Sequence, residues 1–122
     1  MQRVEKMNGL PAPLFVYGSL KRGFRHHRLL RRALRLHDAV APGCRLVLLE
    51  AYPALVYGGA GVQGELYCVD RPLLAKLDVF EDCPELYRRQ LIRLRHGQWA
   101  YAYLAASPRA GDCPRLGTTW RE

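Results

Sequence analysis

Glu81 is the residue of this chain whose surroundings best suit proton transfer. It follows Phe80 at the end of an apolar segment and precedes a loop that contains Pro84, an arrangement that leaves a carboxylate partly removed from water. Burial raises the pKa of a carboxyl group toward neutrality, where the group both accepts and donates protons. The alternative is an ordinary solvated acid at a helix end, one of a group with Asp78, Asp82 and Glu85. The residues alone leave both interpretations open.

A second candidate feature is the sequence Y-G-S-L at the end of an expected strand. Its members are Tyr17, Gly18, Ser19 and Leu20. A glycine at this place permits a turn in which consecutive backbone N–H groups point toward one spot. Such a turn holds a carboxylate or a phosphate with no charged side chain. Most turns of this composition are simple connections, so a ligand-binding loop and an ordinary turn both remain open.

Other common catalytic patterns are missing from the sequence. The four histidines lack metal-binding spacing, so we expect no metal site. Ser19 lies outside a G-x-S-x-G motif, and a serine hydrolase would need a histidine partner supplied by the fold. Residues 18–23 contain neither a G-x-G-x-x-G motif nor a Walker lysine, which leaves nucleotide binding without support. The four cysteines form no C-x-x-C pair, and we expect free thiols.

Positive charge gathers in one short segment. Seven of the 19 basic residues lie from Lys21 to Arg35, with no acid before Asp38, in a chain whose formal net charge is +8. Such a cluster favours an anionic partner, although a solvated basic face is the more common explanation. Phe24 is the one Phe, Tyr or Trp in the segment, which argues against stacking on single-stranded nucleic acid. The competing hypothesis is therefore a non-enzymatic domain that binds nucleic acid, or another anionic partner, through residues 21–35.

The first half of the chain predicts mostly strands. Residues 13–18 form a compact apolar run that ends in glycine, which indicates a buried strand. Leucines and an alanine at helical spacing, with arginines opposite, predict a short amphipathic helix over 26–36. Residues 45–50, 52–58 and 62–69 are further expected strands, separated by proline and glycine.

The second half predicts one helix and a hairpin. Asp70 is an N-cap and Pro72 lies just inside a helix that we expect to end near Phe80. A loop over 81–87 then leads to two strands around His96-Gly97. Strands outnumber helices, so the predicted fold class is α+β: a small mixed β-barrel, closed or nearly closed, flanked by short helices.

Length and composition describe one soluble globular domain. The chain has 122 residues, 49% of them hydrophobic and 25% charged. We expect a single domain over 1–122, with 1–12 and 105–122 as less regular ends. No apolar run approaches the roughly 20 residues of a membrane span, and residues 1–13 lack the apolar core of a signal peptide. We expect a cytoplasmic protein with no membrane partner.

Several segments, in the same order, resemble the gamma-glutamylcyclotransferase-like family and most closely its gamma-glutamylamine cyclotransferase branch. The matching segments are F-V-Y-G-S-L-K-R-G at 15–23, followed by His27 and Leu30, Y-P-A-L at 52–55, G-E-L-Y-C-V-D at 64–70, and L-D-V-F-E-D-C-P-E-L-Y-R-R at 77–89. The resemblance extends from about residue 14 to about residue 104. Several matches in one order are far more specific than any of them alone.

The resemblance implies a small β-barrel flanked by helices and a reaction without cofactor or metal. This reaction releases 5-oxoproline and a free amine from a small-molecule gamma-glutamyl compound. Glu81 would be the general acid/base, and backbone N–H groups of Tyr17–Leu20 would hold the glutamyl α-carboxylate. Tyr87 and Tyr103 are expected as pocket walls or hydrogen-bond donors, with ordinary core residues as the alternative.

The position of Glu81 is the sharpest expectation. Its carboxylate should lie in a concave pocket that faces the backbone N–H groups of Gly18–Leu20. The short stretch between Tyr52 and Gly64 and the minimal turn at His96-Gly97 reduce the loops that could shape a pocket for the leaving amine. The identity of that amine and the oligomeric state are therefore left open by the sequence.

Overall fold

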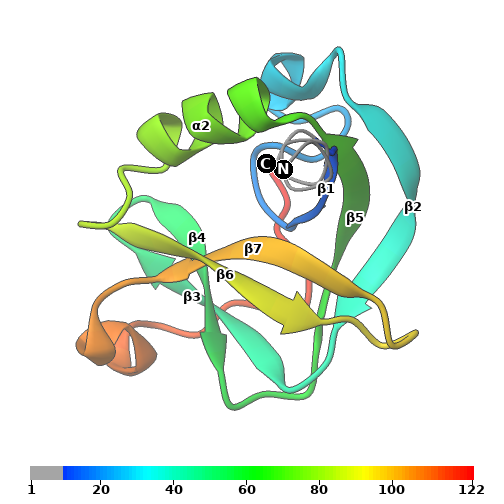
Figure 1. Ribbon diagram of the computed structural model, residues 1–122. Coiled ribbons are helices and arrows are strands. Elements are labelled where there is room, and N and C mark those ends of the chain that lie inside the picture. Colours follow the sequence, from blue (N-terminus) through cyan, green and yellow to red (C-terminus); the bar gives the residue numbers. More distant parts are fainter. Residues whose placement is uncertain (1–9) are drawn as a thin grey trace, which may run out of the picture.

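The computed structural model describes residues 10–122, and its centre is a curled mixed sheet of seven strands. The strands follow the order β2-β5-β1-β7-β4-β3, with β6 paired to β7 beside this path (Figure 1). The elements are β1 (Ala12–Val16), the 3-10 helix η1 (His27–Leu30), β2 (Leu34–Ala41), β3 (Cys44–Leu49), β4 (Tyr52–Tyr57), β5 (Val62–Val69), α2 (Arg71–Phe80), β6 (Tyr87–Arg93), β7 (Trp99–Ala105) and the 3-10 helix η2 (Pro108–Asp112).

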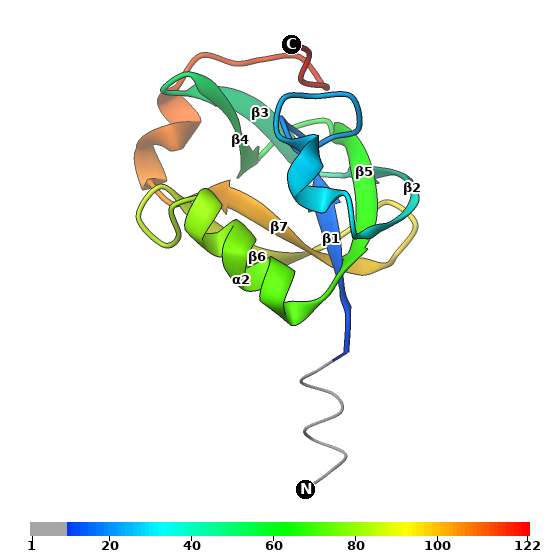
Figure 2. The same ribbon diagram turned by 90° about the horizontal axis from the view of Figure 1, so that it is seen from above.

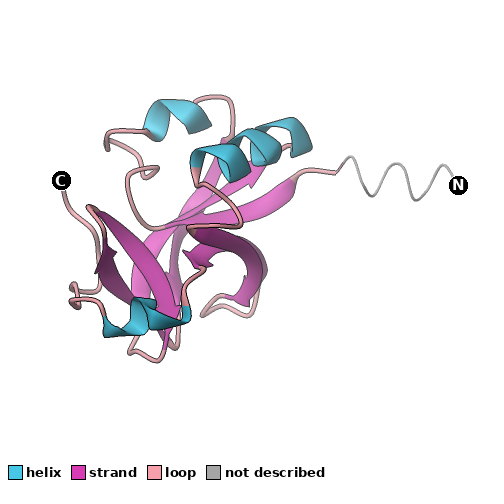
Figure 3. Ribbon diagram, turned by 90° about the vertical axis from the view of Figure 1, so that its left-hand side faces the viewer, coloured by secondary structure: helices cyan, strands magenta, loops and turns pink. Residues whose placement is uncertain are grey.

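The sheet curls into a half-barrel, and Figure 3 shows the helical segments outside the strands. This arrangement confirms the predicted α+β class. The strands expected at 13–18, 45–50, 52–58 and 62–69 and in the hairpin are present, with small differences at their ends. Among the described residues, no helix has the length and apolar character needed to cross a membrane. The four cysteines are free thiols, as expected.

Strand direction brings two distant loops to one end of the sheet. β1 and β4 both run parallel to β7, with Leu14 opposite Tyr101 in the first pair. β6 runs antiparallel to β7 and begins with Tyr87 opposite Ala105, the last residue of β7. The loop after β1 and the loop before β6 therefore lie at the same end of β7. These are the loops that contain the two candidate features of the sequence.

Helix α2 follows the predicted pattern closely. The Asp70 carboxylate accepts a hydrogen bond from the N–H of Leu73 (2.8 Å), and Pro72 lies in the first turn. Leu74 and Leu77 are buried in a core cluster that also contains residues of β1 and β7. Figure 2 shows α2 lying over one side of the sheet. The N-cap, the first-turn proline and the end of the helix at Phe80 are all confirmed.

The helix predicted over 26–36 is wrong. The chain makes four residues of 3-10 helix, His27–Leu30, and from Leu34 onward forms β2, which pairs antiparallel with β5. Leu34 and Leu36 are 65% and 40% exposed, so the apolar stripe is not buried as a helix would require. Without β2, the outer edge of β5 would have a row of unpaired backbone groups. Pairing with that edge therefore overrides the local helical pattern.

The last residues return to the sheet. η2 follows β7, and the chain then runs back along β3, where the N–H of Leu116 donates to the carbonyl of Leu46 (3.0 Å). The N–H of Gln63 in β5 donates to the carbonyl of Thr118 (2.8 Å). The irregular tail expected after residue 105 is thus tied to two strands of the half-barrel.

Gly64 permits the close approach of β5 to β1, and this predicts a stability defect. A Cβ at this position would overlap the carbonyl oxygen of Val16 and lie 2.7 Å from the Phe15 ring. We expect Gly64→Ala to lower the free energy of unfolding by about 2 kcal/mol or more, because the backbone must move. Gly117→Ala is the matched control, since a Cβ there meets no atom within 4 Å. Chemical denaturation of both variants checks this, and equal stability would contradict the packing described.

Candidate active site

Every site residue predicted from the sequence lines one cavity of about 260 Å³. Its walls come from the end of β1 and the loop that follows, the turn between β3 and β4, the end of α2, and strands β6 and β7. The lining residues are Phe15, Val16, Tyr17, Gly18, Ser19, Leu20, His26, Glu50, Tyr52, Pro53, Phe80, Glu81, Leu86, Tyr87 and Tyr103. A second hollow, of about 430 Å³, is lined by none of the predicted site residues.

The turn Gly18–Leu20 uses all of its carbonyl oxygens within the protein. Each of its three carbonyl oxygens accepts a hydrogen bond from the chain that follows. The pairs are Gly18 O with the N–H of Lys21 (3.1 Å), Ser19 O with the N–H of His26 (3.0 Å), and Leu20 O with Nδ1 of His27 (2.9 Å). Within residues 10–122, no hydrogen bond uses the N–H groups of these three residues. The turn therefore has three donors available beside the cavity, the pattern of an anion-binding turn.

Gly18 is needed for this turn to lie against the cavity wall. A Cβ at Gly18 would stand 3.0 Å from Cγ of Pro53, closer than side chains normally pack. Pro53 is itself fixed, because its carbonyl accepts a hydrogen bond from the Tyr87 hydroxyl (2.9 Å). Gly18 is not among the residues with a positive φ, so the reason for a glycine here is packing against Pro53 and not conformational freedom.

Glu81 lines the same cavity from the end of α2. Its backbone N–H donates to the carbonyl of Leu77 (2.8 Å), so Glu81 is the C-cap residue directly after the last helical residue, Phe80. Glu81 is half-buried at the cavity, and this burial raises the pKa of its carboxyl group from 4.5 to about 7. A carboxyl group with such a pKa exchanges protons readily near neutral pH.

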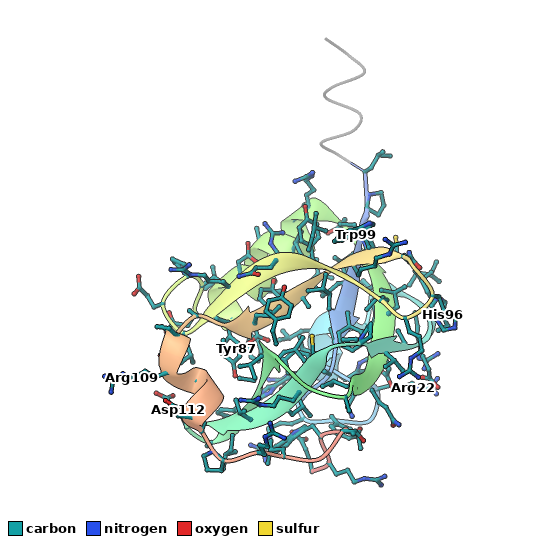
Figure 4. All side chains as sticks on the ribbon, turned by 90° about the horizontal axis from the view of Figure 1, so that it is seen from below. Arg22, Tyr87, His96, Trp99, Arg109 and Asp112 are labelled. Atoms are coloured by element: carbon teal, nitrogen blue, oxygen red, sulfur yellow. The ribbon has the colours of Figure 1, made fainter. Side chains whose placement is uncertain are left out.

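Three of the four tyrosines that line the cavity use their hydroxyl protons within the protein. Burial raises the pKa of Tyr17, Tyr87 and Tyr103 above its ordinary value, so all three stay protonated. Tyr17 donates to the carbonyl of Tyr103 (2.6 Å) and accepts from the N–H of Leu55 (3.2 Å), Tyr87 donates to the carbonyl of Pro53, and Tyr103 donates to Oδ1 of Asp78 (2.7 Å). Figure 4 shows the buried Tyr87 among the strands. The geometry favours walls over hydrogen-bond donors to a ligand.

His26, which was not among the predicted site residues, lines the cavity beside Ser19. Nδ1 of His26 lies 2.9 Å from the Ser19 hydroxyl, and its ring meets Phe80 edge-on at 4.9 Å between centroids. Within residues 10–122, no carboxylate hydrogen-bonds this ring, so the third member of a serine hydrolase triad is missing. The contact links the side chain of Ser19 in the turn to the loop that follows it. The position of His26 next to His27, inside the segment that carries the family resemblance, was the signal available.

The mouth of the cavity was also missed. Glu50 and Tyr52 come from the turn between β3 and β4, and both side chains are exposed. Glu50 adopts a positive φ of 57°, a conformation that non-glycine residues seldom adopt outside tight turns. The two expected strands at 45–50 and 52–58 indicated a tight connection at this place, but no local pattern showed that it borders the cavity.

The basic segment 21–35 does not line the cavity with its arginines. Arg22, Arg25, Arg28, Arg31 and Arg32 are exposed on the surface. Arg35 forms ion pairs with Asp38 and with Glu65. Among residues 10–122, no three His, Cys, Asp or Glu side chains gather closely enough to hold a metal ion.

Comparison with known proteins identifies the family. The profile of the family described as gamma-glutamyl cyclotransferase, AIG2-like, matches residues 14–122. A Vibrio cholerae protein with the provisional name gamma-glutamylcyclotransferase is 42% identical over 92 residues, which cover 74% of this chain and 80% of that protein. Human gamma-glutamylaminecyclotransferase is 41% identical over 97 residues, which cover 69% of this chain and 62% of the human protein. The chain therefore belongs to the gamma-glutamyl cyclotransferase family, which confirms the resemblance found in the sequence.

The fold agrees with this membership. The crystal structure of an AIG2-like protein from Mus musculus superposes with a TM-score of 0.77 at 30% sequence identity, and the match covers 89% of this chain and 88% of the mouse chain. The sheet and the flanking helices are therefore shared with a solved member of the family.

The raised pKa of Glu81 predicts that the free energy of unfolding of the wild type falls as pH rises toward 7. The Glu81 pKa is about 7 in the folded chain against an ordinary value of 4.5, so between these values the unfolded chain binds fewer protons and wild-type stability falls as pH rises. Glu81→Gln removes this effect. We expect the variant to gain up to about 3 kcal/mol relative to wild type between about pH 4.5 and pH 7, and no more above that range.

Urea denaturation of wild type and Glu81→Gln at matched pH values measures this gain. A stability difference between the two proteins that stays constant across the range would show that the carboxyl group is ordinarily solvated.

Proposed function

We propose that the protein is a cyclotransferase that releases 5-oxoproline and a free amine from a gamma-glutamyl amine or gamma-glutamyl amino acid. The observation that supports it best is the meeting, in one cavity, of a carboxyl group with a pKa near 7 and a turn with three available N–H donors. The family membership gives the proposal its reaction class.

In this proposal the turn Gly18–Leu20 holds the α-carboxylate of the glutamyl group. Three backbone N–H groups beside one cavity suit an anion with two oxygens, and they do so with no charged side chain. The aromatic walls Tyr87 and Tyr103 then pack against the methylene groups of the glutamyl chain. The γ-carbonyl extends from the turn toward Glu81.

Ring closure is the chemical step. The substrate's α-amine attacks its own γ-carbonyl carbon, a new C–N bond closes the five-membered ring, and the C–N bond to the leaving amine breaks. Both reacting groups belong to one molecule, so effective molarities of about 10⁵ M or more are available once the chain is held in the ring-closing shape. No nucleophilic side chain is required. The enzyme has to fix one conformation and move protons.

Glu81 would carry a proton from the attacking nitrogen to the leaving nitrogen. Its carboxylate takes one proton from the α-ammonium group, which frees the amine to attack, and the resulting carboxylic acid donates that proton to the leaving nitrogen as the amide bond breaks. The second proton of the new ring nitrogen passes to water, so the products are a neutral lactam and a neutral amine. The carboxylate is thereby restored at the end of the cycle. A pKa near 7 suits this double role because neither protonation state is strongly favoured at neutral pH.

The leaving amine would exit past Glu50, Tyr52 and Phe80, which border the cavity. Phe80 and Tyr52 are 41% and 43% exposed, so they offer apolar and aromatic surface to the departing group. A panel of gamma-glutamyl amines and gamma-glutamyl dipeptides, each assayed for 5-oxoproline by chromatography, identifies the preferred class. Release from none of them would contradict the proposed function.

The proposal predicts that Glu81→Gln loses almost all turnover. Removing a general acid/base costs about 10² to 10⁴ in rate, and the amide cannot replace the carboxylate in either transfer. Glu85→Gln is the matched control, because Glu85 is exposed in the same loop and does not line the cavity. Release of 5-oxoproline by the two variants gives the comparison, with circular dichroism to confirm folding. Equal activity in Glu81→Gln would remove Glu81 from the mechanism.

The pH profile should follow the ionisation of the same group. The base must be ionised when substrate binds, so kcat/KM should fall about tenfold per pH unit below about pH 7. The substrate's ammonium must also lose its proton, which places the optimum at neutral to mildly alkaline pH. Initial rates measured from about pH 5 to about pH 9 at constant ionic strength check this. A rate that stays constant down to pH 5 would exclude a base with the pKa of Glu81.

A further inference from the structure

Lys21 is a buried lysine that the proposed mechanism does not use. It is 7% exposed and is the one charged residue buried in the described part of the chain. Its burial lowers the pKa of the ammonium group. A buried charge is costly unless strong hydrogen bonds compensate it, so its contacts need a reason.

The ammonium group is held by the C-terminal segment. Nζ donates to the hydroxyl of Thr119 (3.1 Å) and to the carbonyl of Trp120 (2.8 Å), and it lies 4.5 Å from the centroid of the Phe24 ring. Among the described residues, no carboxylate lies within ion-pair distance of Nζ. Neutral oxygens and an aromatic face therefore hold this cation in place.

The backbone of Lys21 is part of the turn that faces the cavity. Its N–H donates to the carbonyl of Gly18 (3.1 Å), and its own carbonyl accepts from the N–H of Phe24 (3.0 Å). A displacement of Lys21 would therefore move Gly18 directly, along with the N–H groups of Ser19 and Leu20 between them. The side chain of Lys21 is thus anchored by the C-terminal segment, and its backbone is bonded to the turn that contains the candidate binding groups.

The C-terminal anchor is itself fixed to the sheet. The carbonyl of Thr118 accepts from Gln63 in β5, and the Glu122 carboxylate accepts from the backbone N–H of Arg25 (2.8 Å). The segment 118–122 thus bridges a strand of the half-barrel and both ends of the loop 21–25.

We propose that Lys21 is a positioning residue that holds the turn Gly18–Leu20 against the C-terminal segment, so that residues 118–122 support substrate binding. This inference rests on the proposed function, because the turn matters to activity if it binds the α-carboxylate. It assigns a function to a segment that does not line the cavity.

The test compares three variants of the full chain. Lys21→Met removes both hydrogen bonds while keeping an apolar stem, and Thr119→Val removes one of them with little change of shape. Lys76→Met is the matched control, because Lys76 is exposed on α2 and does not line the cavity. KM, kcat and the inhibition constant of 5-oxoproline are measured for each, and ¹⁵N NMR follows the amide signals of Gly18, Ser19 and Leu20.

The expected result is a loss of binding with chemistry retained. Lys21→Met should raise KM and the 5-oxoproline inhibition constant by about tenfold and change kcat by less than about threefold, because the carboxylate is held equally in ground and transition states. Its turn amide signals should shift. Thr119→Val should show a smaller rise of about twofold to threefold, since one hydrogen bond remains. Lys76→Met should match wild type.

The outcomes separate the two proposals. If wild type releases no 5-oxoproline, the proposed function fails, and the NMR signals still decide whether Lys21 sets the geometry of the turn. Unchanged KM with unmoved signals in Lys21→Met would overturn the inference, as would a fall in kcat at unchanged KM. If Lys21→Met does not fold, Thr119→Val decides by the same criteria.

Discussion

The hydrogen bonds that fix the three carbonyls of the turn Gly18–Leu20 are the constraint on which the candidate site depends. Each carbonyl accepts from a donor in the loop that follows, and the N–H groups of the same three residues make no hydrogen bond within residues 10–122. The donors are the backbones of Lys21 and His26 and the ring of His27. The C=O of one residue and the N–H of the next belong to one peptide group and point in opposite directions, so the bonds to the carbonyls of Gly18 and Ser19 orient the N–H groups of Ser19 and Leu20 away from that loop. The loop 21–30, which contributes no catalytic group, thereby orients N–H groups of the turn that we propose binds the α-carboxylate.

Glu81 depends on a different part of the same architecture. Helix α2 ends at Phe80, and the turn after β1 and the loop that joins α2 to β6 both lie at the C-terminal end of β7. Burial there raises the pKa of Glu81 to about 7, which works against folding at neutral pH and suits proton transfer. Stability and the proposed function are thus opposed at this residue, a relation often found at catalytic carboxyl groups. The helix cap at Asp70 and the buried leucines of α2 stabilise the element that holds Glu81 in place.

Local patterns predicted the elements that depend on local physics. Asp70 and Pro72 marked the start of α2, and alternating or apolar runs marked the strands. The helix expected at 26–36 failed because its outcome was decided by the free edge of β5, a partner about 30 residues away. The family resemblance, and no local pattern, predicted that Glu81 and the turn Tyr17–Leu20 line one cavity. The hydrogen bond from the Tyr17 hydroxyl to Tyr103 and the anchoring of Lys21 by Thr119 join residues far apart in the chain, and no spacing in the sequence marks them.

The most direct measurement of this account is a crystal structure of Glu81→Gln with a gamma-glutamyl substrate bound, since the substitution stops turnover and leaves the turn intact. The account predicts α-carboxylate oxygens about 2.7–3.2 Å from the backbone nitrogens of Gly18–Leu20, with the γ-carbonyl beside position 81. A glutamyl group held outside the cavity, or one whose carboxylate pairs with an arginine of segment 21–35 and leaves the turn empty, would contradict it.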